Sequence, residues 1–179
     1  MRIETIVVGD LFTNCYLLFN DDNKEVLIVD PGDDSDKIID EIKEYKVLGI
    51  LVTHTHDDHI GAIPDITDKY KCPIYDRYNL EEKEYTIGSF KFNVIYTPGH
   101  INDQLVYYFK DEKKMFVGDF IFKNSIGRTD LPNGDEMEMK KSIDKILKYP
   151  KDIKLYPGHG DVTSLKEEEK TLEYFYSIL

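Results

Sequence analysis

Short apolar runs predict that the chain begins with several strands. Three such runs are separated by polar or glycine-containing turns, at residues 5–8, 15–19 and 25–29. Consecutive apolar runs between turn residues are typical of strands that pair antiparallel. Beyond the third run, Ile38, Ile39 and Ile42 recur at helical spacing, and another apolar run fills residues 47–52. This order of strand, helix and strand predicts a β-α-β unit.

The second part of the chain repeats the alternation of strand and helix patterns. A helical pattern covers residues 61–69, with Pro64 near its start. Further strands are predicted from short apolar or alternating segments at 73–75, 90–96, 105–109, 115–117 and 153–156. Two more helices are predicted, one marked by Met139, Ile143, Ile146 and Leu147 and the other spanning 164–177. Strand-rich halves that each carry helices predict two packed sheets with helices outside, an α/β fold in a single domain of residues 1–179.

Composition narrows the range of partners. The formal net charge is -12, from 23 basic and 35 acidic residues, and no basic patch interrupts it. An acidic chain repels polyanions, so neither a nucleic acid nor a membrane surface is expected as a partner. No apolar run approaches the roughly 20 residues that span a bilayer. Cys15 and Cys72 form no Cys-x-x-Cys pattern and no secretory signal is visible, so a cytoplasmic location is expected.

Histidine is concentrated in one segment that follows a predicted strand. Three of the five histidines lie within six positions, in the segment His54-Thr55-His56-Asp57-Asp58-His59. His54 and His56 are separated by one residue and can present imidazole nitrogens to one cation. Asp58 and His59 are adjacent and need not face the same ion, which indicates a second metal. Asp57 is either an orienting partner of a ligand or a solvated loop charge.

The other two histidines occupy similar positions later in the chain. His100 and His159 each follow a Pro-Gly turn at the end of a predicted strand, and Asp119 ends another strand. A single histidine at such a position is more often a hydrogen-bonded structural residue than a ligand. Five histidines and two aspartates gathered at strand ends, however, together predict a metal site.

These residues resemble the signature of the metallo-β-lactamase fold superfamily. Its His-x-His-x-Asp-His motif is present at residues 54–59, and its later histidine, aspartate and histidine match His100, Asp119 and His159 in order. Segments 118–122 and 125–132 are similar to the glyoxalase II branch. The resemblance implies a four-layer αββα sandwich of two mixed β-sheets flanked by helices. It also implies two metal ions, one held by His54, His56 and His100 and the other by Asp58, His59 and His159, with Asp119 bridging them.

The implied activity is hydrolysis of a small-molecule substrate. Two divalent cations would lower the pKa of a shared water toward about 7, and Asp58 would orient that water or accept its proton. The imidazoles favour zinc, while the carboxylates also suit iron or manganese. Every histidine is assigned to metal, so none remains to protonate a poor leaving group. A thiolate, with a thiol pKa of about 8.5, leaves unprotonated, which favours thioesters over amides.

The chain departs from glyoxalase II where that enzyme binds its substrate. The resemblance does not extend to the C-terminal helical domain with which full-length glyoxalase II grips glutathione, so glutathione specificity is not expected. Residues 101–103 replace the usual Thr-x-Gly after the Thr-Pro-Gly-His motif. Lys123 and Arg128 are the nearest basic residues after Asp119 and are candidates to bind an anionic substrate group. An ion pair between Arg128 and Asp130 is the alternative.

Other activities of the same fold stay open. A persulfide dioxygenase branch shares the Gly-Arg-Thr-Asp loop and would use one iron on His54, His100 and Asp119. A lactonase is a further alternative. A β-lactamase is disfavoured by the absent signal peptide and by Asp119, which stands where many such enzymes have cysteine, and a nuclease by the lack of a basic surface. The acidic run 167–169 is expected to be a solvated helix face, and nothing indicates an oligomeric state.

Overall fold

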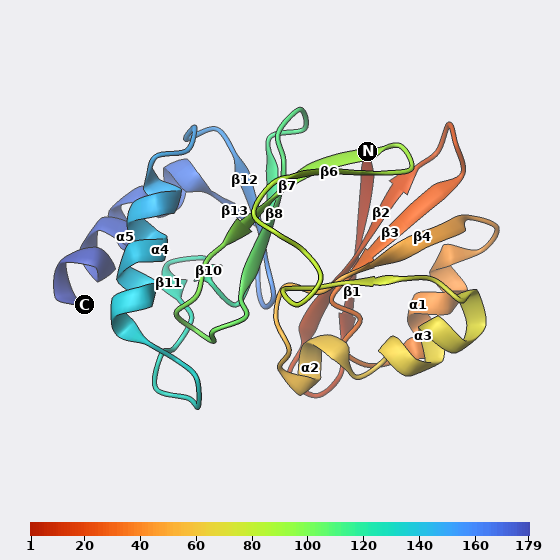
Figure 1. Ribbon diagram of the computed structural model, residues 1–179, viewed down its shortest axis with the longest axis horizontal. Helices are drawn as coiled ribbons and strands as arrows, with labels where there is room; N and C mark the ends of the chain where they lie inside the picture. Colours follow the sequence, from red (N-terminus) through yellow and green to blue (C-terminus); the bar gives the residue numbers. More distant parts are fainter.

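The strands form two mixed sheets in the computed structural model, which describes residues 1–179 (Figure 1). Sheet A has five strands in chain order: β1 (Arg2–Val8), β2 (Thr13–Asn20), β3 (Glu25–Val29), β4 (Lys46–Leu51) and β5 (Ile74–Tyr75). Short turns join the first three strands, which pair antiparallel as predicted. Helix α1 (Ser35–Ile42) carries the chain back from β3 to β4, so these two strands are parallel and the predicted β-α-β unit is confirmed.

Sheet B has six strands in the order β13-β12-β9-β8-β7-β6. Their bounds are β6 (Glu84–Ile87), β7 (Phe90–Tyr96), β8 (Leu105–Phe109), β9 (Lys114–Gly118), β12 (Lys154–Pro157) and β13 (Thr163–Ser164). Strands β6 to β9 form an antiparallel meander. The connection from β9 to β12 contains helix α4 (Glu136–Leu147), and β12 lies parallel to β9. A separate hairpin pairs β10 (Ile121–Phe122) with β11 (Ser125–Ile126).

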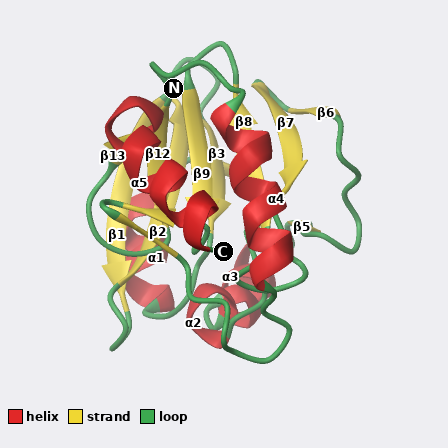
Figure 2. Ribbon diagram, turned by 90° about the vertical axis from the view of Figure 1, so that its left-hand side faces the viewer, coloured by secondary structure: helices red, strands yellow, loops and turns green.

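Helices cover both outer faces, so the fold has four layers (Figures 1 and 2). Helices α1 and α3 (Ile63–Tyr70) pack on sheet A, and α4 and α5 (Leu165–Ile178) pack on sheet B. Buried apolar side chains form one cluster under each helical layer and a third between the sheets. The predicted αββα sandwich is therefore confirmed. None of its helices combines the length and the apolar character that crossing a bilayer requires.

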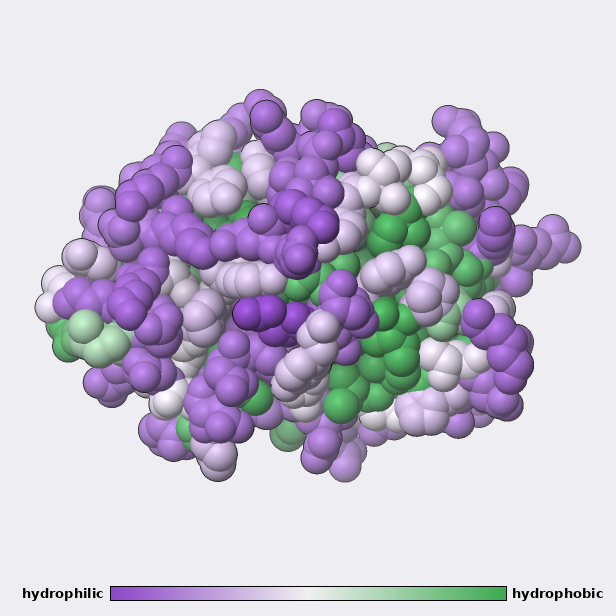
Figure 3. All heavy atoms as spheres, in the orientation of Figure 1, coloured by the Kyte–Doolittle hydropathy of each residue, from purple (hydrophilic) through white to green (hydrophobic).

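The helices bury the apolar positions that predicted them. Ile38 and Ile42 of α1 are fully buried against sheet A because residues four apart share one helix face. Asp135 begins α4 by accepting a hydrogen bond from the backbone N–H of Glu138, which satisfies an otherwise free donor. Outside, hydrophilic residues cover most of the face shown in Figure 3, and the hydrophobic atoms visible there gather over sheet A.

Several local predictions were wrong. The helix expected at 61–69 is α3, which begins two residues later and ends one residue later than predicted, and the separate short helix α2 (Asp57–Ile60) before it was not predicted. Strands β6, β10, β11 and β13 were not predicted, because such short strands carry little periodicity, although the equally short β5 and β12 were recognised. Glu168 is buried rather than solvated, and its carboxylate accepts from the Thr163 hydroxyl and the Asn124 N–H.

Five strands end at the same edge of the sandwich. In sheet A, β3 and β4 run in the same direction. In sheet B, β9 and β12 are parallel, and β7 and β9 are both antiparallel to β8 and so point the same way. Because parallel strands finish together, the loops that follow them lie close in space although they are far apart in sequence.

Backbone hydrogen bonds join the two sheets at this edge. The N–H of Leu105, at the start of β8, donates to the carbonyl of Thr53 after β4, at 2.7 Å. The N–H of Asn14, in β2, donates to the carbonyl of Gly158 after β12, also at 2.7 Å. Gly118 ends β9 with φ +51, and a Cβ there would collide with the Thr53 hydroxyl. A glycine is therefore needed for β9 to approach sheet A so closely.

Two buried tyrosines make further bonds across the sheets. The Tyr16 hydroxyl of sheet A donates to the Pro157 carbonyl of sheet B at 2.6 Å. The Tyr107 hydroxyl of sheet B donates to the Val52 carbonyl, which follows β4, at 2.7 Å. We call these two bonds and the two backbone bonds above the intersheet seam. Each satisfies a backbone carbonyl that lies at or just beyond the end of a strand.

The seam leads to a first prediction. Tyr107→Phe should lower the free energy of unfolding by about 1–2 kcal/mol, because the Val52 carbonyl loses its partner while the apolar ring stays in place. The matched control is Tyr108→Phe on the same strand. Tyr108 is largely buried, but its hydroxyl makes no hydrogen bond, so its removal should change stability by less than about 0.5 kcal/mol. Urea unfolding of the metal-free protein measures both variants. Equal effects would show that the Tyr107 bond adds no stability.

Candidate metal centre

The loops at the joined edge bring all seven predicted ligands together. Their places are His54, His56, Asp58 and His59 after β4, His100 after β7, Asp119 after β9 and His159 after β12. Donor atoms within 4.8 Å of one another form a first cluster of His54, His56 and His100 and a second cluster of Asp58, His59 and His159. Each cluster takes residues from the loops of both sheets.

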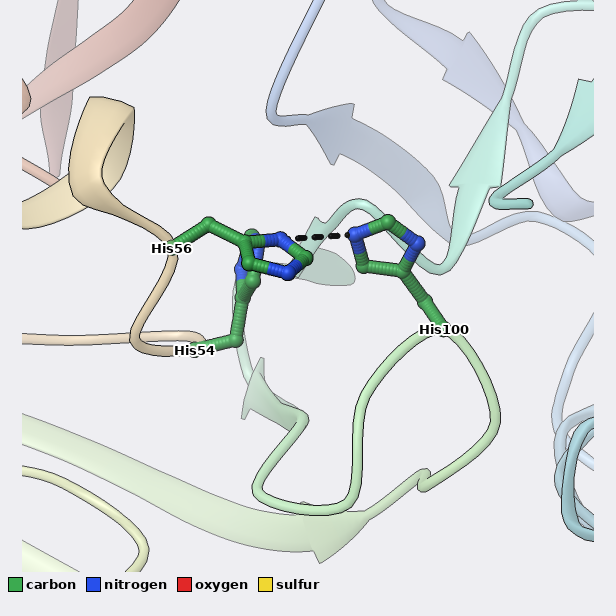
Figure 4. A group of neighbouring side chains, drawn as sticks. All are labelled: His54, His56 and His100. Atoms are coloured by element: carbon green, nitrogen blue, oxygen red, sulfur yellow. Dashed lines mark hydrogen bonds between the residues drawn. The ribbon is translucent and has the colours of Figure 1, made fainter. Parts of the chain in front are cut away.

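Three imidazoles point toward one another in the first cluster (Figure 4). His54 and His56 extend from the loop after β4, and His100 extends from the loop after β7. The Nδ1 atom of His56 lies 3.0 Å from Nε2 of His54 and 3.0 Å from Nε2 of His100. At most one of these two contacts can be a hydrogen bond in neutral rings, because His56 Nδ1 carries at most one hydrogen.

His54 and His100 each make a hydrogen bond through Nδ1, on the side away from the cluster, and this leaves the lone pair of Nε2 facing the other imidazoles. His100 Nδ1 lies 2.8 Å from the Arg128 carbonyl oxygen and donates to it, so Nε2 of the neutral ring is bare. The Thr53 hydroxyl donates to Asp30 at 2.6 Å, so it can only accept from His54 Nδ1, 3.1 Å away. His54 Nε2 is then bare as well. Imidazole nitrogens whose lone pairs converge in this way form the donor set that a cation such as Zn²⁺ binds.

Two carboxylates and two imidazoles meet around the second cluster. Nε2 of His59 lies 3.4 Å from Oδ2 of Asp58 and 3.3 Å from Oδ1 of Asp119. Nε2 of His159 lies 3.3 Å from Oδ2 of Asp58 and 3.4 Å from Oδ2 of Asp119. Oδ2 of Asp119 is also 3.7 Å from Nε2 of His100 in the first cluster. Asp119 therefore lies between the two clusters.

The donors of the second cluster fit a cation. Nε2 of His59 and Oδ1 of Asp119 are both buried and have no hydrogen-bond partner. Leaving such atoms unpaired costs about 1–3 kcal/mol each, and a cation between them would satisfy both. The mix of carboxylate and imidazole suits zinc, iron or manganese. The residues present thus fit two divalent cations, with Asp119 able to serve both.

Asp30 is a buried residue of the site that the sequence did not single out. It follows β3 with φ 50, and its carboxylate accepts from the Thr53 N–H at 2.7 Å, the Thr53 hydroxyl at 2.6 Å and Nδ1 of His59 at 3.0 Å. It also lies near His54, but these bonds occupy its oxygens. Asp30 therefore orients ligands, as carboxylates behind metal-binding histidines do. The available signal was an aspartate beside a Pro-Gly turn at a strand end.

The β1–β2 turn and the first residue of β2 hold two members of the second cluster. The Leu11 carbonyl accepts from Nδ1 of His159 at 3.0 Å, which leaves Nε2 facing the carboxylates. The Thr13 hydroxyl donates to Oδ2 of Asp58 at 2.8 Å. This turn is part of sheet A, while His159 belongs to the last loop of sheet B. The turn and Thr13 thus fix both groups by contacts outside the cluster.

The two clusters favour opposite protonation states when metal is absent. Burial lowers the pKa of His54 and of His100, so both rings are neutral at pH 7. Burial also opposes charge on His59 and His159, but nearby carboxylates outweigh it. Asp119 and Asp30 raise the pKa of His59 to about 10, and Asp119 and Asp58 raise the pKa of His159 to about 9. The second cluster is therefore a set of ion pairs in the metal-free protein.

The predicted substrate-binding residues lie in ion pairs with nearby aspartates. Nζ of Lys123 is 2.9 Å from Asp161, and the Arg128 guanidinium is 2.7 Å from Asp130, the alternative foreseen from the sequence. Arg128 touches the first cluster only through its carbonyl. Asp57 is exposed at the start of α2 and makes no hydrogen bond to a ligand.

Asp30→Asn should weaken metal binding at the second cluster by about 10- to 100-fold. The Asp30 carboxylate accepts three hydrogen bonds through two oxygens, whereas the amide of Asn has only one acceptor oxygen. His59 would therefore lose the bond that fixes its orientation. Competition with a chelator of known affinity measures the change. Asp36→Asn, an exposed position on α1, is the control and should leave the affinity unaltered. Unchanged affinity in Asp30→Asn would remove its orienting role.

Metal binding at the second cluster should release about two protons at pH 7, one each from His59 and His159. Both groups are protonated below their raised pKa values and must lose a proton to bind metal. Affinity at this cluster should therefore fall as the pH drops from about 9 to 7, by up to about 100-fold per unit. Titration calorimetry in buffers of different ionisation enthalpy counts the protons. A release near zero would contradict the prediction.

Comparison with known proteins agrees with this arrangement. The profile of the metallo-β-lactamase superfamily matches residues 8–81 and 76–159. Hydroxyacylglutathione hydrolase GloC of Haemophilus influenzae is 30% identical over 213 residues, which cover 99% of each chain. The crystal structure of BLEG-1 B3 metallo-β-lactamase has a TM-score of 0.91 at 35% identity, covering 97% of this chain and 99% of that one. TTHA1623 in a di-iron-bound form has a TM-score of 0.85 at 28% identity, with 94% and 98% covered.

These matches extend over nearly the whole chain rather than over the histidine motif alone. The similar structure has the same fold as this chain, and the similar relative comes from the same family of metal-dependent hydrolases. The relative named GloC agrees with the glyoxalase II-like resemblance of the sequence. This chain belongs to the metallo-β-lactamase superfamily.

Proposed function

We propose that this protein is a two-metal hydrolase whose substrate is a thioester. One observation carries the proposal: two clusters of metal-binding groups lie side by side with Asp119 between them. Two divalent cations held there would lower the pKa of a shared water toward about 7 and supply hydroxide at neutral pH. Zinc, iron and manganese all suit these donors, and the similar TTHA1623 structure is a di-iron form.

The chain's own groups would orient the attacking water. Burial opposes ionisation of Asp58, but His159 and His59 outweigh it and lower the pKa of its carboxyl. Asp58 is therefore a carboxylate at neutral pH and can accept a hydrogen bond from the water. Its rotation is limited by the Thr13 hydroxyl, which donates to Oδ2 at 2.8 Å. Holding an acceptor in one position beforehand lowers the barrier to attack.

The leaving group favours a thioester over an amide. All five histidines belong to the two clusters, so no free imidazole is left to protonate a departing amine. A thiol has a pKa of about 8.5 and leaves as the thiolate, whereas the nitrogen of an amide would leave as a far more basic anion and therefore needs a proton before it departs. The relative GloC is named a hydroxyacylglutathione hydrolase, and a hydroxyacylglutathione is a thioester. A small thioester is the substrate we propose.

Two further observations bear on other functions and on location. The 35% identity with BLEG-1 makes β-lactam hydrolysis the second candidate. A persulfide dioxygenase would need one iron only, and the unpartnered Nε2 of His59 in the second cluster supports two cations instead. Cys15 and Cys72 are unpaired, which supports a reducing compartment such as the cytoplasm.

The test is turnover of a neutral thioester by protein loaded with metal. We expect S-acetyl-N-acetylcysteamine to be hydrolysed with two metal equivalents bound, chelation to abolish turnover and added metal to restore it. Thiol release measures the rate, and elemental analysis of protein purified without added metal counts the ions. A simple lactone, a β-lactam and glutathione persulfide with oxygen uptake are the comparison substrates. Oxygen consumption by a one-iron protein without ester hydrolysis would overturn the proposal.

Asp58→Ala supplies the matching variant. It should lower kcat by at least about 100-fold, because a ligand of the second cluster and the acceptor for water are lost together. Circular dichroism should show the fold unchanged, and elemental analysis should show less bound metal. Asp68→Ala, at an exposed site on α3, is the control. Full activity in Asp58→Ala would remove the two-metal mechanism.

A further inference from the structure

We propose that the mouth of the metal centre selects thioesters whose thiol portion is neutral or cationic and disfavours anionic thiols such as glutathione. The inference rests on the proposed function and names its substrate class. It follows from the charges around the pocket that reaches the second cluster. Asp10, Asp33 and Asp57, here called the rim aspartates, determine this selectivity.

The pocket adjoins the second cluster at Asp58, which is the one predicted metal ligand among its lining residues. It has a volume of about 410 Å³ and lies between the β1–β2 turn, the loop after β3 and helix α2. One wall is Asp58, whose Oδ2 lies 3.4 Å from the unpartnered Nε2 of His59. A molecule in this pocket would therefore lie against Asp58, one of the groups that we propose hold the second cation. The volume accommodates a small thioester.

The pocket wall carries negative charge and no positive charge. Asp10, Asp33, Asp57 and Asp58 line it, and no lysine, arginine or histidine does. The three rim aspartates are exposed and form no salt bridge. Because Asp58 belongs to the second cluster, only the rim aspartates remain as charges that face the substrate. They lie within about one Debye length, roughly 10 Å at 0.1 M salt, of a substrate in the pocket.

The nearest basic residues after Asp119 do not reverse this charge. Lys123 is paired with Asp161 at 2.9 Å, and Arg128 is paired with Asp130 at 2.7 Å through two hydrogen bonds. Each pair is close to neutral as a unit, so neither offers a free cation to a carboxylate of the substrate. Two bound cations would carry positive charge, but Asp58, Asp119 and a hydroxide offset most of it. The rim aspartates then make the mouth negative overall.

An apolar surface stands beside the same mouth. Leu11 lines the pocket with 64% of its surface exposed, and Phe12 next to it is 71% exposed. The turn that carries them is held in place, because the Leu11 carbonyl accepts from His159. Exposed apolar side chains on a fixed turn can contact the hydrocarbon part of a substrate. The mouth thus combines an apolar contact with a field that repels anions.

The decisive experiment gives the same acetyl group to three thiols. Acetylthiocholine is cationic, S-acetyl-N-acetylcysteamine is neutral and S-acetylglutathione is anionic. Each kcat/KM is divided by the rate constant for hydroxide-catalysed hydrolysis of the same ester, which removes differences in leaving-group reactivity. At low ionic strength we expect the normalised value for acetylthiocholine to exceed that for S-acetylglutathione by about tenfold or more. Added salt should lower the first value and raise the second.

Variants that remove charge test whether the rim aspartates cause the preference for the cationic thioester. Asp10→Asn/Asp33→Asn keeps the size of both side chains and should shrink the cation-to-anion ratio severalfold. The control, Asp22→Asn/Glu44→Gln, removes the same charge from exposed turns that precede β3 and β4, at the far end of sheet A, and should leave the ratio unchanged. Asp57 is left intact because it adjoins Asp58.

Each outcome decides between the two proposals. A normalised kcat/KM for S-acetylglutathione that equals or exceeds that for acetylthiocholine would overturn the selectivity and leave thioester hydrolysis standing. A ratio that does not respond to Asp10→Asn/Asp33→Asn would likewise remove the rim aspartates as its cause. Turnover of none of the three esters would overturn the proposed function, and the selectivity with it.

Discussion

The intersheet seam is the constraint on which the site depends. Each sheet supplies only part of each cluster, so donor atoms from separate loops meet only if the sheets stay in register at one edge. The backbone bonds from Leu105 to Thr53 and from Asn14 to Gly158 fix that register next to the ligands themselves. Gly118 allows the approach because a side chain there would collide with Thr53. The geometry of the site is thus set by loops whose starting points the joined strand ends hold in place.

The groups around each histidine decide whether its pKa is raised or lowered. His54 and His59 are both buried and follow β4 closely, His54 in the loop and His59 in the short helix α2. His54 is surrounded mainly by other imidazoles, so burial lowers its pKa. His59 lies between the carboxylates of Asp30 and Asp119, so its pKa is raised. One short motif thus supplies histidines with opposite pKa shifts to two neighbouring clusters.

Much of the fold and of the candidate site was visible in the sequence, for identifiable reasons. Long strands and helices show a clear period, and His100, Asp119 and His159 stand at strand ends where parallel strands converge. Very short strands carry little periodicity, so β6, β10, β11 and β13 were missed, although β5 and β12 were found. Asp30 was missed because its importance lies in contacts with Thr53 and His59, which are distant in sequence. Glu168 was misjudged because an acidic run does not reveal that its middle residue turns inward.

The order in which the ligands occur along the chain has a consequence for assembly. All members of the first cluster have been synthesised once His100 is reached, whereas the second waits for His159, which follows the last strand parallel to β9. During synthesis from the N-terminus, the three-imidazole set is therefore available to an ion well before the mixed set is complete. A chain interrupted between β9 and β12 would have one full coordination set and one that is short of a donor, and so could hold only the first of the two ions that we propose.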